Sequence, residues 1–240
     1  MLEFKEVTFG YEEDNYKLFE NLSFKIDSGE FISIIGASGC GKSTIFRLIN
    51  GLEKLESGSI NVDEKTGYMP QKDLLFPWRT IMDNIKLPLE LKTNKKTNSS
   101  QLCQEILKDV GLYEYKDNYP RELSGGMRQR VSFARTLIAG AELLMLDEPF
   151  SALDSLTKMS MQEWLLNQWT ANSKTILFVT HDIEEAIFLS KKIYVFTECP
   201  ARSLKVYDIP LAYPRNRHMM KDQDILELKE ELTQKLRREV

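Results

Sequence analysis

The stretch FISIIGASGCGKSTIFRLIN, residues 31–50, decides the fold. It opens with a short apolar run typical of a buried strand. The glycine-rich segment GASGCGKS, residues 36–43, follows at once and matches the pattern G-x-x-x-x-G-K-[ST]. Beyond it, Ile45, Leu48 and Ile49 recur at helical spacing. A strand, a glycine loop and a helix in this order place backbone N–H groups where they can bind phosphates. The stretch therefore predicts an α/β protein that binds a nucleotide.

Each position of this loop has a chemical reason. Glycine removes the Cβ that would keep the backbone from wrapping around phosphates. Lys42 is expected to reach the β- and γ-phosphates, and Ser43 to offer its hydroxyl to Mg²⁺. A glycine-rich turn that matches by chance is the alternative, but both flanks of the loop are correct. The predicted nucleotide contacts of the loop are Gly36, Ser38, Gly39, Cys40, Gly41, Lys42, Ser43 and Thr44.

Hydrolysis needs a carboxylate for the metal and a group that orients water. The run LLMLDEP predicts a buried strand that brings Asp147 to the metal, followed by Glu148 as general base. A charged surface loop is the alternative interpretation of this acidic pair, and the presence of the glycine loop disfavours it. His181 follows TILFVT at the end of another predicted strand, the edge at which open α/β sheets bind ligands. A lone histidine is more often structural, but here it is placed to touch the γ-phosphate and the attacking water.

Bulk composition narrows the class of protein. The 240 residues contain 32 Lys and Arg against 36 Asp and Glu, a net charge of −4 that gives no general attraction to nucleic acid. No stretch approaches the roughly 20 apolar residues that span a bilayer, and the N-terminus does not resemble a signal peptide. Cys40, Cys103 and Cys199 are few and unpatterned, as in a reducing compartment. Cys40 is either an accessible thiol or, as we expect, a small residue that fits the loop.

Outside the loop, the pattern alternates between strands and helices. Strands are expected at LSFKI, GSINV and TGYMPQ and again within 142–150, 174–182 and 191–196, with helices around MQEWLLNQW and IEEAIFLS. Such alternation predicts a parallel sheet covered by helices. Residues from about 83 to 140 instead show helical patterns, interrupted by the polar loop KTNKKTNSS. We expect one domain over 1–240, with about 1–82 and 141–240 as the α/β core and about 83–140 as an inserted helical subdomain.

The C-terminal segment predicts an amphipathic helix over about 221–238. Ile225, Leu228, Leu232 and Leu236 form one stripe, and acids precede bases in the sense that the helix dipole favours. We expect this helix to dock on its own core. A membrane-surface or partner helix is the alternative.

The stretch LSGGMRQR, residues 123–130, predicts a second phosphate-binding helix N-terminus. VSFARTLIAG continues it with helical spacing, so Ser124, Gly125 and Gly126 can hold an anion. The stretch has neither a lysine nor an obvious metal ligand. It is half of a site, and the economical interpretation is that it closes over a nucleotide held by a second copy of the chain, in a two-fold dimer.

In order and in combination, these motifs resemble the nucleotide-binding subunit of an ATP-binding cassette (ABC) transporter across almost the whole chain. LSGGM is similar to the family's signature loop, with Met127 where glutamine is commoner. The resemblance implies a RecA-like P-loop core with a mostly parallel sheet, an N-terminal antiparallel β subdomain and an inserted helical subdomain. It also implies ATP and Mg²⁺ as cofactors. Tyr11 of VTFGY would stack on adenine, Gln71 of YMPQKD would contact the metal and the water, and Asp154 of SALD would lie at the dimer interface.

LLFPWRTIMDNI, LSGGM and YPRNR resemble importers of nitrate, sulfonates or taurine, and importers of thiamine-precursor pyrimidines share much of this pattern. The resemblance implies a second copy of the chain, a membrane permease contacted near Gln71, Phe76 and Trp78, a solute-binding protein, and a place at the cytoplasmic face of the membrane. Phe76 and Trp78 could instead belong to the core. Two other classes stay open: a cassette ATPase acting on nucleic acid or ribosomes, which the acidic charge disfavours, and a P-loop kinase, which would not require the second loop. The residues do not identify the solute.

Overall fold

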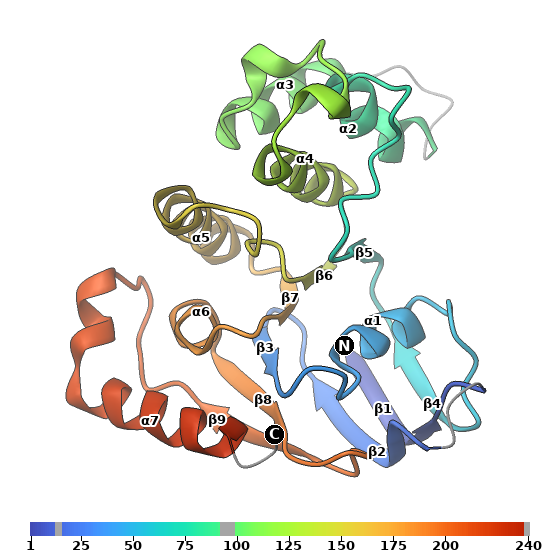
Figure 1. Ribbon diagram of the computed structural model, residues 1–240, viewed down its shortest axis with the longest axis vertical. Helices are drawn as coiled ribbons and strands as arrows, with labels where there is room; N and C mark the ends of the chain where they lie inside the picture. Colours follow the sequence, from blue (N-terminus) through green and yellow to red (C-terminus); the bar gives the residue numbers. More distant parts are fainter. Residues whose placement is uncertain (13–15, 92–98, 238–240) are drawn as a thin grey trace. The chain divides into compact units, whose positions relative to one another are not determined.

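The computed structural model describes residues 1–12, 16–91 and 99–237 (Figure 1). The chain divides into two compact units. The first unit is Met1–Lys65 with Leu165–Val240, and the second is Thr66–Trp164. The predicted helical segment, about 83–140, lies inside the second unit. Of the predicted polar loop, residues 92–98 lie outside the described residues, whereas Ser99 and Ser100 begin a helix.

The first unit contains an antiparallel sheet of three strands in the order β2-β1-β4 (Figure 1). These strands are β1 (Leu2–Phe9), β2 (Phe19–Ile26) and β4 (Ser57–Val62). The rings of Phe4 and Phe24, paired across β1 and β2, stack with centroids 4.4 Å apart. Such cross-strand aromatic pairs stabilise an antiparallel ladder.

The same unit holds the strands of the parallel sheet that position the glycine loop. β3 (Phe31–Ile35) lies between β7 (Thr175–Val179) and β8 (Lys192–Phe196) and is parallel to both. Every residue of β3 and β7 is buried, as expected for short apolar runs in the middle of a sheet. β9 (Leu204–Asp208), which the sequence did not predict, pairs antiparallel with β8.

Three helices of the first unit follow these strands. They are α1 (Lys42–Ile49), α6 (Ile183–Leu189) and α7 (Gln223–Arg237), and a short 3-10 turn, Arg217–Lys221, precedes α7. Ile225 and Leu232 of α7 are buried in a cluster with α6, β8 and β9, and Leu228 and Leu236 pack against its rim. The prediction that this helix docks on its own core is therefore confirmed.

The second unit combines a pair of parallel strands with helices. β5 (Thr66–Met69) pairs with β6 (Leu143–Asp147), and between them in sequence come α2 (Ile81–Glu90), α3 (Ser99–Asp109) and α4 (Gly125–Ile138). Two 3-10 turns, Tyr113–Tyr115 and Pro120–Glu122, lead from α3 to α4. The long helix α5 (Ser155–Asn172) begins in this unit and ends in the first. The predicted α/β class, with a mostly parallel sheet, an N-terminal antiparallel sheet and a helical region, is confirmed.

Candidate functional site

The glycine loop ends in a backbone conformation that needs glycine. Gly41, the N-cap of α1, has φ 95°, in the left-handed region that side chains rarely adopt. Lys42 is the first residue of α1, and its Nζ donates to the carbonyl oxygens of Gly36 (2.9 Å) and Ala37 (2.7 Å). The ammonium group is thus held by the carbonyl oxygens of the loop that precedes α1. The first N–H groups of an α-helix have no acceptor within the helix and can bind an anion.

Close packing fixes the other end of the loop. A Cβ at Gly36 would lie 2.7 Å from Phe196 Cβ and 2.9 Å from Cys40 Sγ. Cys40 is only 6% exposed, and burial raises the pKa of its thiol, although the charge of Lys42 acts in the opposite direction. The idea of an accessible thiol is wrong, and Cys40 is the small residue that fits the loop.

Tyr11 and Thr44 lie together at the start of α1. The hydroxyl groups of the two residues are 3.2 Å apart, and Thr44 is buried. The ring of Tyr11 meets that of Phe9 edge to face, with centroids 5.0 Å apart. Tyr11, the predicted adenine contact, is therefore held next to Thr44, one of the predicted nucleotide contacts of the glycine loop.

His181 follows the strand that neighbours the glycine loop. β3 and β7 are parallel, with Ile34 opposite Val179, so the loop after β3 and the segment after β7 leave the same edge of the sheet. His181 is exposed there, and Asp182 caps α6 directly after it by accepting from Glu184 N at 2.9 Å. The short helix thus fixes the backbone on which His181 stands.

The second unit brings Gln71 and Glu148 together. β5 and β6 are parallel, with Met69 opposite Leu146, so their following residues share one edge. Gln71 Nε2 donates to Glu148 Oε2 at 3.1 Å. Asp147, the last residue of β6, is 2% exposed, and Glu148 has φ 48°, an unusual value for a residue with a side chain.

The LSGGM loop begins a helix, as the sequence predicts. Ser124 is the N-cap of α4, and its Oγ accepts from Met127 N at 3.3 Å. Gly125 and Gly126 form the first turn, and a Cβ at Gly126 would lie 2.8 Å from the carbonyl oxygen of Ala152. Ser124 to Gly126 therefore stand at a helix N-terminus packed against the SALD segment of the same chain.

Asp154 ends that segment. Its carboxylate accepts from Thr157 N at 3.0 Å, in the first turn of α5, and this hydrogen bond lowers the pKa of Asp154. The side chain is exposed. The SALD segment is thus anchored at both ends, by α4 and by α5.

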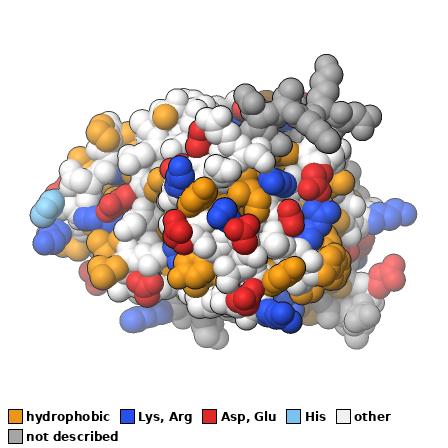
Figure 2. Space-filling view, turned by 90° about the horizontal axis from the view of Figure 1, so that it is seen from above, with side chains coloured by type: hydrophobic (Ala, Val, Ile, Leu, Met, Phe, Trp, Pro, Cys, Tyr) orange, Lys and Arg blue, Asp and Glu red, His pale blue; other side chains and the backbone are white. Residues whose placement is uncertain are grey.

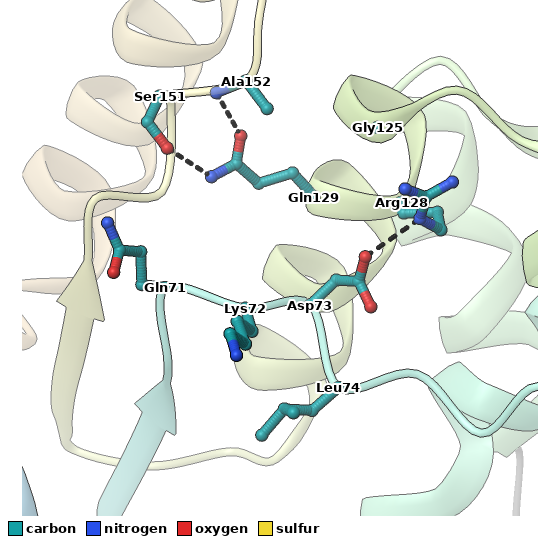
Figure 3. Close-up of a pocket in the computed structure, with 9 residues that line it drawn as sticks. All are labelled: Gln71, Lys72, Asp73, Leu74, Gly125, Arg128, Gln129, Ser151 and Ala152. Atoms are coloured by element: carbon teal, nitrogen blue, oxygen red, sulfur yellow. Dashed lines mark hydrogen bonds and ion pairs between the residues drawn. The ribbon is translucent and has the colours of Figure 1, made fainter.

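Gln129, which the sequence analysis did not single out, ties α4 to the segment that runs from Glu148 to Ala152 (Figure 3). Its side chain is 4% exposed and comes from α4. Nε2 donates to the carbonyl oxygen of Glu148 (2.8 Å) and to Ser151 Oγ (3.1 Å), while Oε1 accepts from Ala152 N (2.8 Å). A glutamine in a helix is usually on the surface, so its residue type did not indicate a special role. The only signal in the sequence was its position just after LSGG.

The segment after Gln71 is tied to α4 as well. Arg128 Nε is 3.0 Å from Asp73 Oδ2, and its Nη1 donates to Leu123 O at 2.8 Å. Arg135 donates to the carbonyl oxygens of Asp73 (2.7 Å) and Leu74 (2.9 Å). A pocket of about 430 Å³ lies between these elements (Figure 3). Its lining residues are Gln71, Lys72, Asp73, Leu74, Gly125, Arg128, Gln129, Ser151 and Ala152.

Phe76 and Trp78 stand on an ordered turn. Trp78 is 71% exposed and meets Phe76 edge to face at 5.3 Å, so Trp78 is not a core residue. The turn is held by Asn84, a fully buried side chain that the sequence analysis overlooked. Asn84 accepts from Phe76 N (2.8 Å) and donates to the carbonyl oxygens of Phe76 (3.1 Å), Arg79 (3.1 Å) and Thr80 (2.9 Å).

A strand, a glycine loop with lysine and a helix, together with a carboxylate pair at the end of a buried strand, define a P-loop ATPase. Comparison with known proteins narrows the class. The family described as ABC transporter matches residues 19–151. The chain is 44% identical over 212 residues to the formylaminopyrimidine import ATP-binding protein ThiZ of Halalkalibacterium halodurans, covering 88% of this chain and 85% of that one. It is 40% identical over 221 residues to the aliphatic sulfonates import ATP-binding protein SsuB of Bacillus subtilis, covering 89% and 86%.

The fold agrees. A dimeric ATP-binding cassette in a post-hydrolysis state, bound to ADP and Pi, superposes with a TM-score of 0.79 at 28% identity, covering 88% of this chain and all of that one. The chain belongs to the ABC transporter family, as one of its ATP-binding subunits, which are ATPases.

Proposed function

We propose that this chain is the ATP-hydrolysing subunit of a membrane importer for a small solute and that it works as a head-to-tail dimer with two shared ATP sites. The observation that carries hydrolysis is the hydrogen bond between Gln71 and Glu148 beside the buried Asp147. This hydrogen bond places the Glu148 carboxylate, which can take a proton from water, beside the Gln71 amide, which can orient the same water. Import rests on the relatives, both named as import ATP-binding proteins.

In the proposed site, the first unit holds the nucleotide. The N–H groups of the loop and α1 and the ammonium of Lys42 bind the phosphates, Thr44 contacts the α-phosphate and Tyr11 lies against the adenine. His181, at the same sheet edge as the loop, contacts the γ-phosphate and the attacking water. Glu148 accepts the proton of that water, and Gln71 keeps it oriented.

The proposed metal ligands suit Mg²⁺. Ser43, Gln71 and Asp147 offer a hydroxyl, an amide oxygen and a buried carboxylate, and Mg²⁺ prefers oxygen ligands shared with phosphates. When bound, Mg²⁺ would neutralise charge that develops on the phosphates.

Among the described residues, 1–12, 16–91 and 99–237, no helix has the length and apolar character to cross a bilayer.

The shared sites follow from the incomplete second loop. Ser124, Gly125 and Gly126 present a helix N-terminus without a lysine of their own, so they suit the γ-phosphate of a nucleotide held by another copy. Asp154 then belongs to the interface between the two copies.

Electrostatics does not favour binding to nucleic acid. The net charge of the chain is −4, and positive and negative side chains are interspersed on the face shown in Figure 2.

The permease is proposed to contact the turn of Phe76 and Trp78, near Gln71, which would place the subunit at the cytoplasmic face of the membrane. An exposed tryptophan on a turn fixed by a buried asparagine suits a binding hot spot. Trp78→Ala should leave ATP hydrolysis by the isolated subunit unchanged and weaken co-purification with the permease. Tyr115→Ala, which alters another exposed aromatic of the same unit, is the control. Equal co-purification of both variants would remove Trp78 from the contact.

The solute class proposed from the relatives is a sulfonate or a formylaminopyrimidine-like compound. Nitrate and taurine stay within the same proposal. The membrane protein that co-purifies with this chain, reconstituted in vesicles with each labelled solute, would discriminate these candidates. Transport of none of them under ATP would contradict the solute class.

Glu148→Gln tests the hydrolytic site. The variant should bind ATP, lose turnover by about 10²-fold or more, as expected for loss of a general base, and accumulate as an ATP-bound dimer. Sizing in Mg-ATP and release of phosphate measure both effects. Glu142→Gln, an exposed glutamate just before β6, is the matched control. Near wild-type turnover by Glu148→Gln would remove Glu148 from the role of general base.

A further inference from the structure

Gln129 has an arrangement that its own helix does not require. It lies three residues beyond Gly126 on α4, and its side chain hydrogen-bonds to the segment that runs from Glu148 to Ala152. A glutamine that only fitted a helix would point to solvent or to its own helix. Here the side chain is only 4% exposed, and both the nitrogen and the oxygen of its amide form hydrogen bonds with another segment.

The segment that it holds contains Glu148. The carbonyl oxygen of Glu148 accepts from Gln129 Nε2 at 2.8 Å and also from Ser151 Oγ at 3.0 Å. The φ of Glu148 is 48°, so its backbone sits in a sparsely populated region and depends on its surroundings to stay there. Gln129 supplies part of that support directly at the peptide of Glu148.

The same segment touches the start of α4. The α-carbon of Gly126 lies so close to Ala152 that an added Cβ would be 2.8 Å from the Ala152 carbonyl oxygen. Ser124 and Gln129 lie on one helix, less than two turns apart. Because close-packed elements move together rather than deform, a shift at Ser124 is passed to the peptide of Glu148.

We propose that Gln129 is a positioning residue that couples the LSGGM loop to the Glu148 of the same chain. The inference rests on the proposed function. When the loop of one chain binds the nucleotide held by its partner, Gln129 fixes that chain's own Glu148 in position for the nucleotide that the chain itself holds. Each site is thereby made ready by occupation of the other.

Gln129→Met tests the coupling, because methionine keeps the length and the unbranched shape of glutamine and removes its hydrogen bonds. The turnover number should fall about tenfold or more, since small misplacements of a reacting group cost up to about 10²-fold. The KM for ATP should stay within about twofold, because the lost interaction acts on the chemical step. Thr136→Val, which removes only a bond from Thr136 Oγ1 to Ser132 O inside α4, is the control and should retain wild-type turnover.

A second measurement separates coupling from a merely structural role. In the background of Glu148→Gln, adding Gln129→Met should leave ATP-driven dimerisation unchanged in sizing experiments, because the LSGGM loop still binds the partner's nucleotide. Loss of that dimer would mean that Gln129 only shapes the loop, and unchanged turnover of the single variant would mean that it positions nothing. Either result would overturn the proposal.

Mixed dimers made from differently tagged chains test whether the effect stays within one chain. Glu148→Gln silences the site of the chain that carries it, while that site still binds ATP and occupies the partner's LSGGM loop. If Gln129→Met is on the same chain as Glu148→Gln, the remaining site keeps an intact Gln129 beside its own Glu148 and should turn over. If Gln129→Met is on the other chain, the remaining site depends on the altered residue and should be slow. Equal turnover of the two mixtures, active or silent, would contradict the proposal.

The reference is the Ser124→Arg homodimer. If this homodimer hydrolyses ATP normally, the shared-site function itself is wrong. If it is inactive while Gln129→Met is as fast as wild type, only the coupling is wrong. The two failures are therefore distinguishable.

Discussion

Two helices of this chain begin in glycine-rich loops, yet their N-termini are built differently. α1 begins after Gly41, which has no side chain for capping and adopts a left-handed φ, and Lys42 turns back over the loop carbonyls. α4 begins after Ser124, whose own hydroxyl caps the first turn. The first loop is complete by itself, with donors and a fixed cation, whereas the second offers donors alone.

Their glycines differ in a more instructive way. A Cβ at Gly36 would clash with Phe196 and Cys40, so the packing of the first unit itself requires glycine there. A Cβ at Gly125 would meet nothing closer than Arg128 Nη2 at 3.9 Å, which is ordinary contact. Among the described residues, no neighbour of Gly125 requires the absence of a side chain at this position. The proposed shared site would account for this glycine, because a nucleotide held by another copy of the chain would approach it closely.

The largest expected effect concerns the two loops as binding sites. Lys42→Ala should weaken ATP binding to the monomer about tenfold to hundredfold, because a charged hydrogen bond is worth about 1.5–3 kcal/mol. Fluorescent-nucleotide titration at dilute protein measures it. A variant with wild-type affinity would show that the first loop does not need its cation.

Ser124→Arg should separate binding from turnover. Monomer affinity for ATP should stay within about twofold, while hydrolysis falls about 10²-fold, the usual cost of losing one transition-state donor. The same titration and a phosphate-release assay are compared at one protein concentration. If affinity fell as it does for Lys42→Ala, the two loops would belong to one site within a single chain.

The glycines provide a smaller and independent effect on stability. Gly36→Ala should lower the free energy of unfolding by about 1–3 kcal/mol, as overpacking does. Gly125→Ala should change it by no more than about 0.5 kcal/mol, as for an uncrowded site, and should still slow hydrolysis by the dimer. Urea unfolding curves and turnover assays of the two variants measure this. A Gly125→Ala variant with wild-type turnover would mean that nothing approaches this position closely.

The smallest effect is on thiol reactivity. Burial raises the pKa of Cys40, and it raises the pKa of Cys103 to about 11, whereas Cys199 is exposed. A raised pKa means less thiolate at pH 8, so iodoacetamide should label Cys199 first, and labelling of Cys40 should increase with pH. Peptide mass spectrometry over time follows all three sites. Equal rates at Cys40 and Cys199 would show that the first loop opens readily.

The sequence predicted the fold where signals are local. The run before Gly36 and the apolar stretches at 142–150 and 174–182 are β3, β6 and β7, because strands buried on both faces are continuously apolar. β9 was missed because an antiparallel edge strand of five residues, with only Tyr207 buried, has no such run. Its pairing with β8 is visible only in three dimensions.

Within the candidate site, residue types that carry chemistry were predictable and their supports were not. Lys42, Ser124 and Glu148 stand in motifs whose spacing indicates a role. Gln129 and Asn84 are ordinary helix residues in sequence. Their importance comes from burial and from partners 19 to 23 and 4 to 8 residues away, which periodicity cannot indicate. The exposure of Trp78 was likewise undecided until the structure placed it.

The left-handed backbone of Glu148 has an evolutionary consequence. A side chain in this region costs about 1–2 kcal/mol that glycine would not incur. The proposed general base therefore occupies a position where selection for folding and selection for turnover disagree. Glu148→Gly should melt at a higher temperature than Glu148→Ala, although both lack the carboxylate. The free-energy cost of the left-handed backbone would then be intrinsic to the site. It would be retained because a glycine at this position could not accept a proton from water.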